Sequence, residues 1–342
     1  MEKRLYNKKS KEELIKNLRS EPFKRITCSF YKYTTIKTPL QFRDSMYLYL
    51  DSLKILGRVY IASEGINAQI SVPDYVWNEF KRGIKNFRVL KNVRIKKAIS
   101  DGDSFYKLVV KEKKEIVAYG VPDDLYDMNK VGQYLNAEQF NKAIDEGNTA
   151  VIDMRNFYET EVGRFKNAEI PKVEKSKDLL PEVRRMLNGR EDHKVLLYCT
   201  GGIRCEKASS FLIKSGIKNV KQLQGGIIQY AHDIRNKNMD SKFIGKNFVF
   251  DARLGERITK DIIANCHLCG SPSDNHRDCN NDTCHILFIQ CKKCEEKLSG
   301  CCSNECMDFA SLPMSKQKEL RKDPKRVIKK RYYRTPEISG DY

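Results

Sequence analysis

The sequence predicts an α/β chain of three parts, each marked by its own pattern. The first part alternates strand-like and helix-like stretches in an order close to βαββαβ, which is typical of a ferredoxin-like α+β sandwich. The middle part alternates short apolar runs with amphipathic helices, which predicts a doubly wound parallel sheet. The last part carries nine of the chain's 12 cysteines, and their close pairs predict a Cys-rich zinc-binding region.

The length of 342 residues exceeds that of a usual single core, so several domains are expected. Asp123 to Asn129 is predicted to be a linker, because it is rich in Asp and bounded by Pro122 and Gly132. We expect four segments: a ferredoxin- or acylphosphatase-like domain at 1–122, the parallel-sheet domain at 130–238, the Cys-rich zinc-binding region at 245–312 and a basic tail at 313–342.

The composition indicates a polyanionic partner. The chain has 64 Lys and Arg against 45 Asp and Glu, for a net charge of +19. Such an excess attracts nucleic acid, although a lysine-rich proteome would raise the charge without any binding role. No apolar run reaches the roughly 20 residues of a membrane span, and the charged start MEKRLYNKKSKEEL has no signal-peptide core. We expect a cytoplasmic protein with no membrane contact, whose cysteines serve catalysis and metal binding rather than disulfides.

The first part reads as a series of short elements. Residues 1–22 predict a polar lead helix. The elements that follow are a strand from Arg25, a helix over Gln41 to Lys54, the strands GRVYIA and INAQISV, a helix from Pro73, and strands near 89–99 and 105–110. Glu64-Gly65 lies between the two central strands and is most simply a hairpin turn; a catalytic role for Glu64 is the alternative.

Two stretches combine basic and aromatic residues. Nine Lys and Arg side chains between Lys81 and Lys107 accompany Phe87, Phe105 and Tyr106. These rings would stack on bases if they are exposed, or belong to the core if they are buried. The tail from Lys316 to Arg334 is the second stretch, and we expect it to be an arm that binds a polyanion.

The middle part predicts strands and helices in strict alternation. They are a helix over Ala137 to Asp145, the strand AVIDMR, a loop to Ile170, a helix near Asp178 to Leu187, the strand VLLY at 195–198, a helix from Cys205, the strand NVKQL and a helix from Gly226. In such sheets the site lies outside the carboxyl ends of the strands. Cys199 directly follows the central strand, so it stands at this edge.

The stretch Cys199-Thr-Gly-Gly-Ile-Arg204 has the composition of an anion cradle. Gly201 and Gly202 let backbone amides turn toward the sulfur. These amides, the start of the following helix and Arg204 favour thiolate over thiol, lowering the pKa from the free value of about 8.5. We therefore expect Cys199 and Arg204 to be catalytic and both glycines to support them. A buried structural cysteine is the bland alternative.

Cys205 lies six residues after Cys199, in the first turn of the expected helix. It could resolve a persulfide or a sulfenate on Cys199. Packing explains its presence nearly as well.

The cysteines of the last part form four close pairs, which would be a liability in a reducing cytosol unless metal held them. We prefer a cross-brace with two zinc ions. One ion takes Cys266, Cys269, Cys291 and Cys294; the other takes Cys279, Cys284, Cys306 and either Cys301 or Cys302. His267, His276 or His285 could substitute in either site, and an iron–sulfur cluster is the alternative occupant. Because each ion would be surrounded by sulfur ligands, we expect the metal to be structural rather than catalytic.

The loop at Cys199 resembles the active-site loop of rhodanese domains. VIDMRN at 151–156 and LQGGI at 223–227 agree with this resemblance. Four residues separate Cys199 from Arg204, one fewer than in cysteine phosphatases, and the smaller ring suits a persulfide or a thiolate better than a phosphate. In rhodaneses an Arg at the place of Arg155 helps to frame the loop, so the resemblance implies a supporting role; a structural ion pair is the alternative.

Taken together, IASEGIN, VIDMRN, CTGGIRCEKAS, GKNFVFDARLGERIT and the block ending CCSNEC resemble the bacterial tRNA uridine(34) hydroxylase family, rhodanese-domain proteins with an acylphosphatase-like N-terminal domain. The resemblance implies a tRNA partner and oxygen-dependent hydroxylation at C5 of uridine 34 to 5-hydroxyuridine, with molecular oxygen as co-substrate and Cys199 as the active cysteine. One departure is the segment between Ala168 and Leu180, which is shorter than expected for the family.

The chemistry leaves alternatives open. A Cys199 thiolate could add to C6 of uracil and make C5 reactive toward oxygen. We find no Gly-x-Gly-x-x-Gly motif after a strand and no evident set of two His and one carboxylate for iron. The alternatives are a sulfurtransferase that passes persulfide sulfur to tRNA or a small acceptor, and a non-catalytic RNA-binding scaffold.

Overall fold

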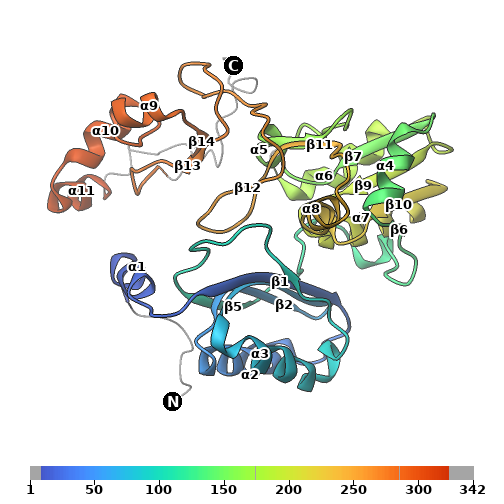
Figure 1. The fold of residues 1–342 in the computed structure, drawn as a ribbon, viewed down its shortest axis with the longest axis horizontal. Helices are drawn as coiled ribbons and strands as arrows, with labels where there is room; N and C mark the ends of the chain where they lie inside the picture. The colour runs from blue at the N-terminus through green and yellow to red at the C-terminus, as the bar shows by residue number, and fades with distance from the viewer. Residues whose placement is uncertain (1–8, 174, 285, 323–342) are drawn as a thin grey trace. The chain divides into compact units, whose positions relative to one another are not determined.

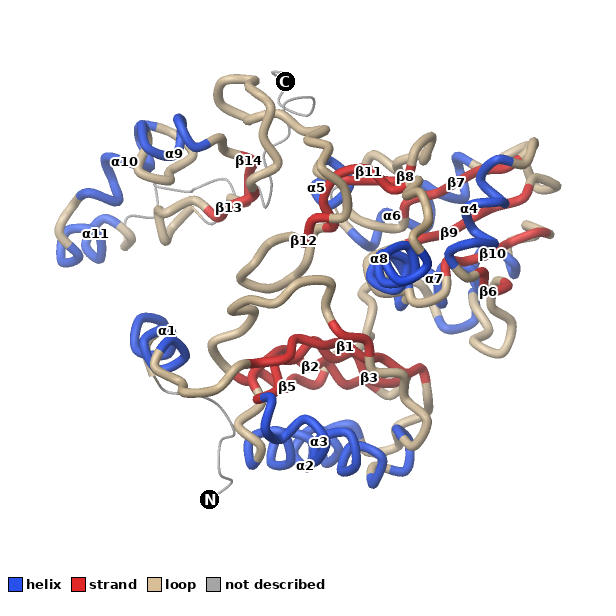
Figure 2. The backbone as a smooth tube through the Cα atoms, viewed as in Figure 1, coloured by secondary structure: helices blue, strands red, loops and turns tan. Residues whose placement is uncertain are grey.

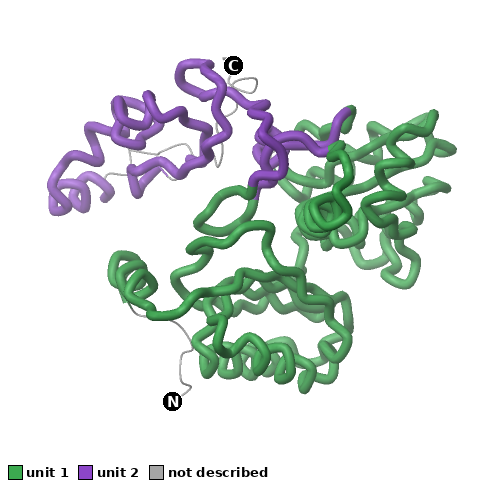
Figure 3. The backbone as a smooth tube through the Cα atoms, viewed as in Figure 1, with its two compact units in different colours: residues 1–156, 167–242, 249–256 green, residues 157–166, 243–248, 257–342 purple. Residues whose placement is uncertain are grey.

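The computed structural model describes residues 9–173, 175–284 and 286–322 (Figure 1). The chain divides into two compact units, drawn in different colours in Figure 3. The first comprises residues 1–156, 167–242 and 249–256; the second comprises 157–166, 243–248 and 257–342. The second unit therefore takes in residues 157–166, which lie in sequence within the predicted middle part.

A five-stranded sheet with two helices on one face forms the N-terminal part of the first unit (Figure 2). Its elements are α1 (Lys11–Arg19), β1 (Arg25–Tyr33), α2 (Pro39–Ser52), β2 (Leu56–Ala62), β3 (Gly65–Pro73), α3 (Trp77–Gly83), β4 (Lys96–Lys97) and β5 (Leu108–Glu112). The strand order is β4-β1-β3-β2-β5. The first four strands pair antiparallel as in a ferredoxin-like sandwich, and β5 is an added strand that pairs parallel with β2.

Alternation along β1 gives this sheet two different faces. Cys28 and Phe30 belong to the buried core. Because successive side chains point to opposite faces of a strand, Tyr31 and Tyr33 lie on the other face. This face carries the aromatic side chains that contact the middle part of the chain.

The region of the predicted strand near 89–99 mostly folds otherwise. A short 3-10 helix covers Arg88–Leu90, and only Lys96–Lys97 pair as a strand. Leu90 is fully buried, and Phe87 makes edge contacts with Phe42 and Tyr49 at centroid distances of 5.6 and 5.4 Å. These side chains thus fill the N-terminal core from helical turns, which an extended strand would not allow.

The rings of the basic stretch are mostly used for packing. Phe87 packs against the N-terminal core and Phe105 is buried. Tyr106 is half-buried, with the Lys107 ammonium 5.8 Å from its ring centroid. The core interpretation therefore holds for both phenylalanines.

The middle part is a four-stranded, wholly parallel sheet in the order β6-β10-β9-β7. Its elements are β6 (Gln133–Leu135), α4 (Ala137–Asp145), β7 (Thr149–Asp153), α6 (Ser176–Met186), β9 (Lys194–Tyr198), α7 (Ile203–Lys214), β10 (Asn219–Leu223) and α8 (Gly226–Lys237). The apolar side chains of β9 are buried on both faces, as doubly wound sheets require. The predicted fold class is confirmed.

The second unit contains short elements. They are α5 (Phe157–Glu161), β8 (Gly163–Phe165), β11 (Phe243–Asn247), β13 (His276–Asp278), β14 (Leu287–Ile289), α9 (Lys292–Lys297), α10 (Asn304–Ser311) and α11 (Met314–Leu320). β8 pairs antiparallel with β11, and the rings of Phe165 and Phe243 meet edge to face at 5.4 Å. The stretch expected to be a loop up to Ile170 thus holds a helix and a strand. The predicted basic tail begins at residue 313, and its part after Lys322 lies outside the described residues. His285 also lies outside them.

Candidate active site and sulfur clusters

Cys199 occupies the turn between β9 and α7, at the carboxyl edge of the parallel sheet. Gly202 caps the helix with φ of 96°, a left-handed conformation that favours glycine. In this conformation the Gly202 N–H donates to Cys199 Sγ at 3.1 Å. Cys199 itself is fully buried. The turn therefore presents the sulfur to backbone donors inside the protein.

The surroundings favour the thiolate of Cys199. Burial acts to raise its pKa, but a hydrogen bond from the Cys205 thiol, the charge of Arg204 and the backbone N–H groups of Cys205 and Arg204 outweigh burial and lower the pKa to about 5. Burial, the hydrogen bond to Cys199 and the charge of Cys199 raise the pKa of Cys205 well above its ordinary value, although Arg204 acts in the opposite direction. Cys205 thus remains a thiol that donates to its neighbour.

The glycines of LQGGI close the loop from the other side. Ile227 N–H donates to the Cys199 carbonyl at 3.0 Å, and Ile228 N–H donates to the Thr200 carbonyl at 3.1 Å. A Cβ atom on Gly226 would lie 2.5 Å from the Cys199 carbonyl oxygen. Only glycine lets the start of α8 approach the loop this closely.

Arg204 is nearly buried beside the loop. Its guanidinium donates to Thr200 Oγ1 at 3.2 Å and lies 5.8 Å from the ring centroid of Phe250. Phe250 comes from the GKNFVFDARLGER stretch. This stretch therefore helps to hold the arginine that lowers the pKa of Cys199.

Arg155 is fully buried and forms an ion pair with Asp153, with Nε–Oδ1 and Nη2–Oδ2 distances of 2.9 and 2.7 Å. Its guanidinium also lies 5.7 Å from the ring centroid of Tyr198, the residue before Cys199. The ion pair matches the structural alternative, and the supporting role of Arg155 stays a prediction.

The N-terminal sheet supplies side chains that the sequence did not place at this site. Lys96 of β4 donates from Nζ to the Gly201 carbonyl. Tyr31 of β1 donates to Glu206 Oε1 at 3.0 Å, and Tyr134, from β6 of the parallel sheet, donates to Glu206 Oε2 at 2.6 Å. A Cβ atom on Gly202 would lie 2.9 Å from the Tyr31 hydroxyl. The active loop is therefore packed directly against the first sheet.

Glu64 takes part in a buried ion-pair network. The Lys207 ammonium of α7, whose side chain is 0% exposed, lies 3.0 Å from Glu64 Oε2 and 2.7 Å from Glu115 Oε2. Glu64 Oε1 also accepts from the Ile116 N–H at 2.7 Å. Through these contacts the Glu64 side chain links the β2–β3 turn to α7.

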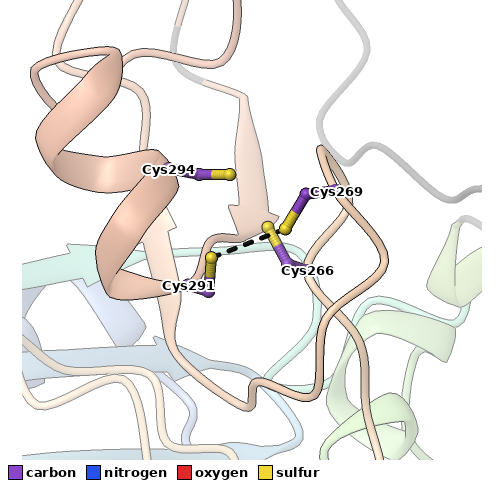
Figure 4. Close-up of side chains that lie close together, drawn as sticks. All are labelled: Cys266, Cys269, Cys291 and Cys294. Carbon is purple, nitrogen blue, oxygen red and sulfur yellow. Dashed lines mark hydrogen bonds between the residues drawn. The ribbon is translucent and has the colours of Figure 1, made fainter.

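The cysteines of the second unit gather in two sets of four. The sulfur atoms within each set lie within 4.8 Å of one another. The sets are Cys266, Cys269, Cys291 and Cys294 (Figure 4), and Cys279, Cys284, Cys302 and Cys306. This is the cross-braced grouping that the spacing predicts. Cys302 completes the second set, and Cys301 lies outside it.

The geometry of both sets suits a tetrahedral metal. With Zn–S bonds of about 2.3 Å, neighbouring sulfurs of a tetrahedron lie about 3.8 Å apart. The distance between Cys269 Sγ and Cys291 Sγ is 3.6 Å, and Cys302 Sγ lies 3.7 Å from the sulfurs of Cys284 and Cys306.

The histidines of this unit make other contacts. His267 Nε2 lies 2.7 Å from Glu161 Oε1, and the His276 ring meets Phe248 edge to face at 5.1 Å. Neither belongs to a described sulfur set.

Comparisons with known protein families cover most of the chain. Residues 25–116 match the family described as UPF0176 acylphosphatase like domain, 136–233 the rhodanese-like domain, and 244–307 the family described as rhodanase C-terminal. A crystal structure of a rhodanese-related protein from Thermoplasma volcanium matches 30% of this chain and 92% of its own, with 24% identity and a TM-score of 0.25.

Relatives match nearly the whole length. A protein of Leptospira interrogans named tRNA uridine(34) hydroxylase is 48% identical over 93% of this chain and 87% of its own. Proteins of the same name from Pectobacterium carotovorum and Escherichia fergusonii are each 47% identical over 93% of this chain and cover 90% and 91% of their own. By this identity and coverage, the chain belongs to the tRNA uridine(34) hydroxylase family.

Proposed function

We propose that this protein hydroxylates uridine 34 of tRNA at C5 to give 5-hydroxyuridine, with molecular oxygen as co-substrate and Cys199 as the residue that contacts the base. The observation that carries the proposal is the set of donors around the Cys199 sulfur: the Gly202 N–H donates to Sγ at 3.1 Å, and the Cys205 thiol, Arg204 and backbone N–H groups lower its pKa to about 5 despite burial. Such a sulfur is a nucleophile at neutral pH. The relatives' shared name supplies the substrate and the reaction.

In the proposed reaction the Cys199 sulfur bonds to C6 of uracil, and the electrons of the C5–C6 double bond move toward O4. C5 then carries enolate character and reacts with oxygen. One oxygen atom stays on C5, and the other leaves as water after a reductant supplies two electrons. Loss of the C5 proton and of the thiolate restores the ring. A low pKa also makes the sulfur a good leaving group in this last step.

Arg204 and the loop amides act on the anionic form of the sulfur in the first and in the last step of the proposed reaction. They stabilise the thiolate before it attacks and again when it departs. Cys205 donates a hydrogen bond to the same sulfur, and this contact is also compatible with the resolution of an oxidised Cys199.

We further propose that each set of four cysteines holds one structural Zn²⁺. Thiolates are ligands that zinc prefers, and four of them leave no position open for water. The ion would fix the turns of a segment with few large apolar residues. A tRNA substrate also fits the excess of positive charge and a cytoplasmic location. Among the described residues, every helix falls short of a membrane span in length or in apolar character.

Mass spectrometry of tRNA nucleosides tests the reaction. In cells that lack other 5-hydroxyuridine synthesis, the wild-type chain should restore the nucleoside, and growth under oxygen-18 gas should label its C5 oxygen. Cys199→Ser should lower the product by about 10³-fold or more. Cys28→Ser is the matched control, since Cys28 is also buried but lies in the N-terminal core.

Three results would contradict the proposal. Full product from Cys199→Ser would mean that the reaction does not use this sulfur, and a sulfur-containing nucleoside would favour sulfur transfer. With tRNA that carries 5-fluorouridine, the wild-type protein should form a covalent adduct at Cys199; without an adduct, attack at C6 is wrong.

A further inference from the structure

Lys96 places a cation from the N-terminal sheet on the active loop. Its ammonium donates to the carbonyl of Gly201, two residues after Cys199. β4 pairs with β1 at Ser29 and Cys28, which fixes the position of Lys96 relative to the sheet. The neighbouring Lys97 is exposed, and its ammonium lies 5.3 Å from the ring centroid of Trp77. Only the first of these adjacent lysines is directed to the loop.

Several groups hold Lys96 in this position. Its ammonium lies 4.6 Å from the ring centroid of Tyr31, a distance typical of a cation–π contact. The Tyr31 hydroxyl in turn donates to Glu206 at the start of α7. The lysine is therefore fixed between an aromatic face and the loop.

Burial makes the charge of Lys96 costly unless anions compensate it. Burial lowers its pKa to about 8, while Cys199 and Glu206 act in the opposite direction and Arg94 adds to the lowering. Since the coupling of two charges is reciprocal, a cation favoured by the Cys199 anion also favours that anion. The charged groups that face this pair are Arg94, Arg204 and Glu206, and the neutral titratable groups are Tyr31, Tyr134 and Cys205.

We propose that Lys96 is a positioning residue of the Cys199 site, whose charge keeps the sulfur anionic and whose hydrogen bond to Gly201 holds the loop. The N-terminal domain thereby supplies part of the active site. This inference deepens the proposed function, because it rests on Cys199 as the reacting group, but it can be measured without the hydroxylation reaction.

The test separates the charge of Lys96 from its hydrogen bond. Lys96→Gln keeps a donor and removes the charge, Lys96→Arg keeps both, and Lys97→Gln is the matched control on the same strand. The readout is the ultraviolet absorbance of the Cys199 thiolate across pH, taken as the difference between each variant and the same variant with Cys199→Ser. Lys96→Gln should raise the midpoint by about one pH unit, whereas Lys96→Arg and Lys97→Gln should leave it within about 0.3.

A wild-type midpoint in Lys96→Gln would overturn the proposal and leave Lys96 with a purely structural contact. If that variant fails to fold, the reciprocal measurement decides: in Cys199→Ser the pKa of Lys96, followed by the pH dependence of its methylation, should fall, and an unchanged value would overturn the proposal. Full hydroxylation by Cys199→Ser would refute the proposed function alone, since the shift in the thiolate midpoint does not depend on that activity.

Discussion

The sulfur atom of Cys199 and the sulfur atoms of the clustered cysteines in the second unit have opposite surroundings. Cys199 lies among backbone N–H groups, a thiol donor and Arg204, which together lower its pKa to about 5 against the effect of burial. The clustered sulfurs lie within 4.8 Å of three others. A sulfur surrounded by hydrogen-bond donors is stabilised as an anion without a metal, whereas sulfurs gathered together repel one another as anions and need a cation between them.

Cys28 adds a reference to this comparison. It is buried like Cys199, but burial dominates and raises its pKa far above the ordinary value, with only a small opposing effect from Lys97. Burial alone therefore suppresses reactivity. The difference between these two cysteines comes from the loop, not from their depth in the protein.

The largest expected effect is on the stability of the Cys-rich segment, when the proposed metal is removed from the sulfur sets. A strong chelator should unfold the Cys-rich segment, because structural zinc contributes about 10–16 kcal/mol in small zinc domains. Elemental analysis should find one ion for each of the two sets, one ion fewer in Cys269→Ser, and no loss in Cys301→Ser. Loss of metal in Cys301→Ser but not in Cys302→Ser would contradict the assignment of the second set.

A smaller effect is expected at the buried ion pairs beside the active loop. Glu64→Gln removes one of two carboxylates around the Lys207 ammonium and should lower the free energy of unfolding by about 2 kcal/mol, measured by urea denaturation. Glu112→Gln, at an exposed position of β5, should change it little. Loss of hydroxylation at unchanged stability would instead assign Glu64 a chemical role.

Per pH unit, the smallest of the three expected effects comes from titration of Cys199, and it sharpens the comparison through pH. Because the folded pKa of Cys199 is lowered to about 5, while that of an unfolded cysteine is about 8.5, its thiolate stabilises the fold fully above the unfolded pKa. This contribution is lost as the pH falls through the folded value. The unfolding free energy of wild type relative to Cys199→Ser should therefore decrease by up to about 1.4 kcal/mol per pH unit between these limits. A pH-independent difference would mean that the folded thiol titrates like free cysteine.

Local patterns predicted most of the fold. The helix over Ala137–Asp145 and the strand over Asn219–Leu223 have the predicted bounds, and α8 begins at Gly226 as expected. The two helices have amphipathic patterns that begin after a polar or glycine residue, and the strand is a short segment between helical patterns, so short-range sequence suffices. The pairing of the cysteines was equally local, because sulfur spacing limits the possible sets.

The rest depends on contacts between distant residues. β8 is a strand because β11 pairs with it, and its three residues carry no period of their own. In the sequence, Lys96 is one member of a basic stretch, and only the register of β4 on β1 distinguishes it from Lys97. Tyr31 and Glu206 meet across 175 positions of the chain, a separation that no local pattern encodes.

In the proposed reaction, the complete burial of Cys199 sets a condition on turnover. A nucleobase cannot reach a sulfur that has no exposed surface, so each catalytic cycle must include a displacement that uncovers it. Tyr31 and Lys96 both contact the loop, so we expect this displacement to involve them. The rate of this opening sets an upper limit on the rate of modification, and the closed state shields the reactive sulfur from stray oxidants between encounters with RNA.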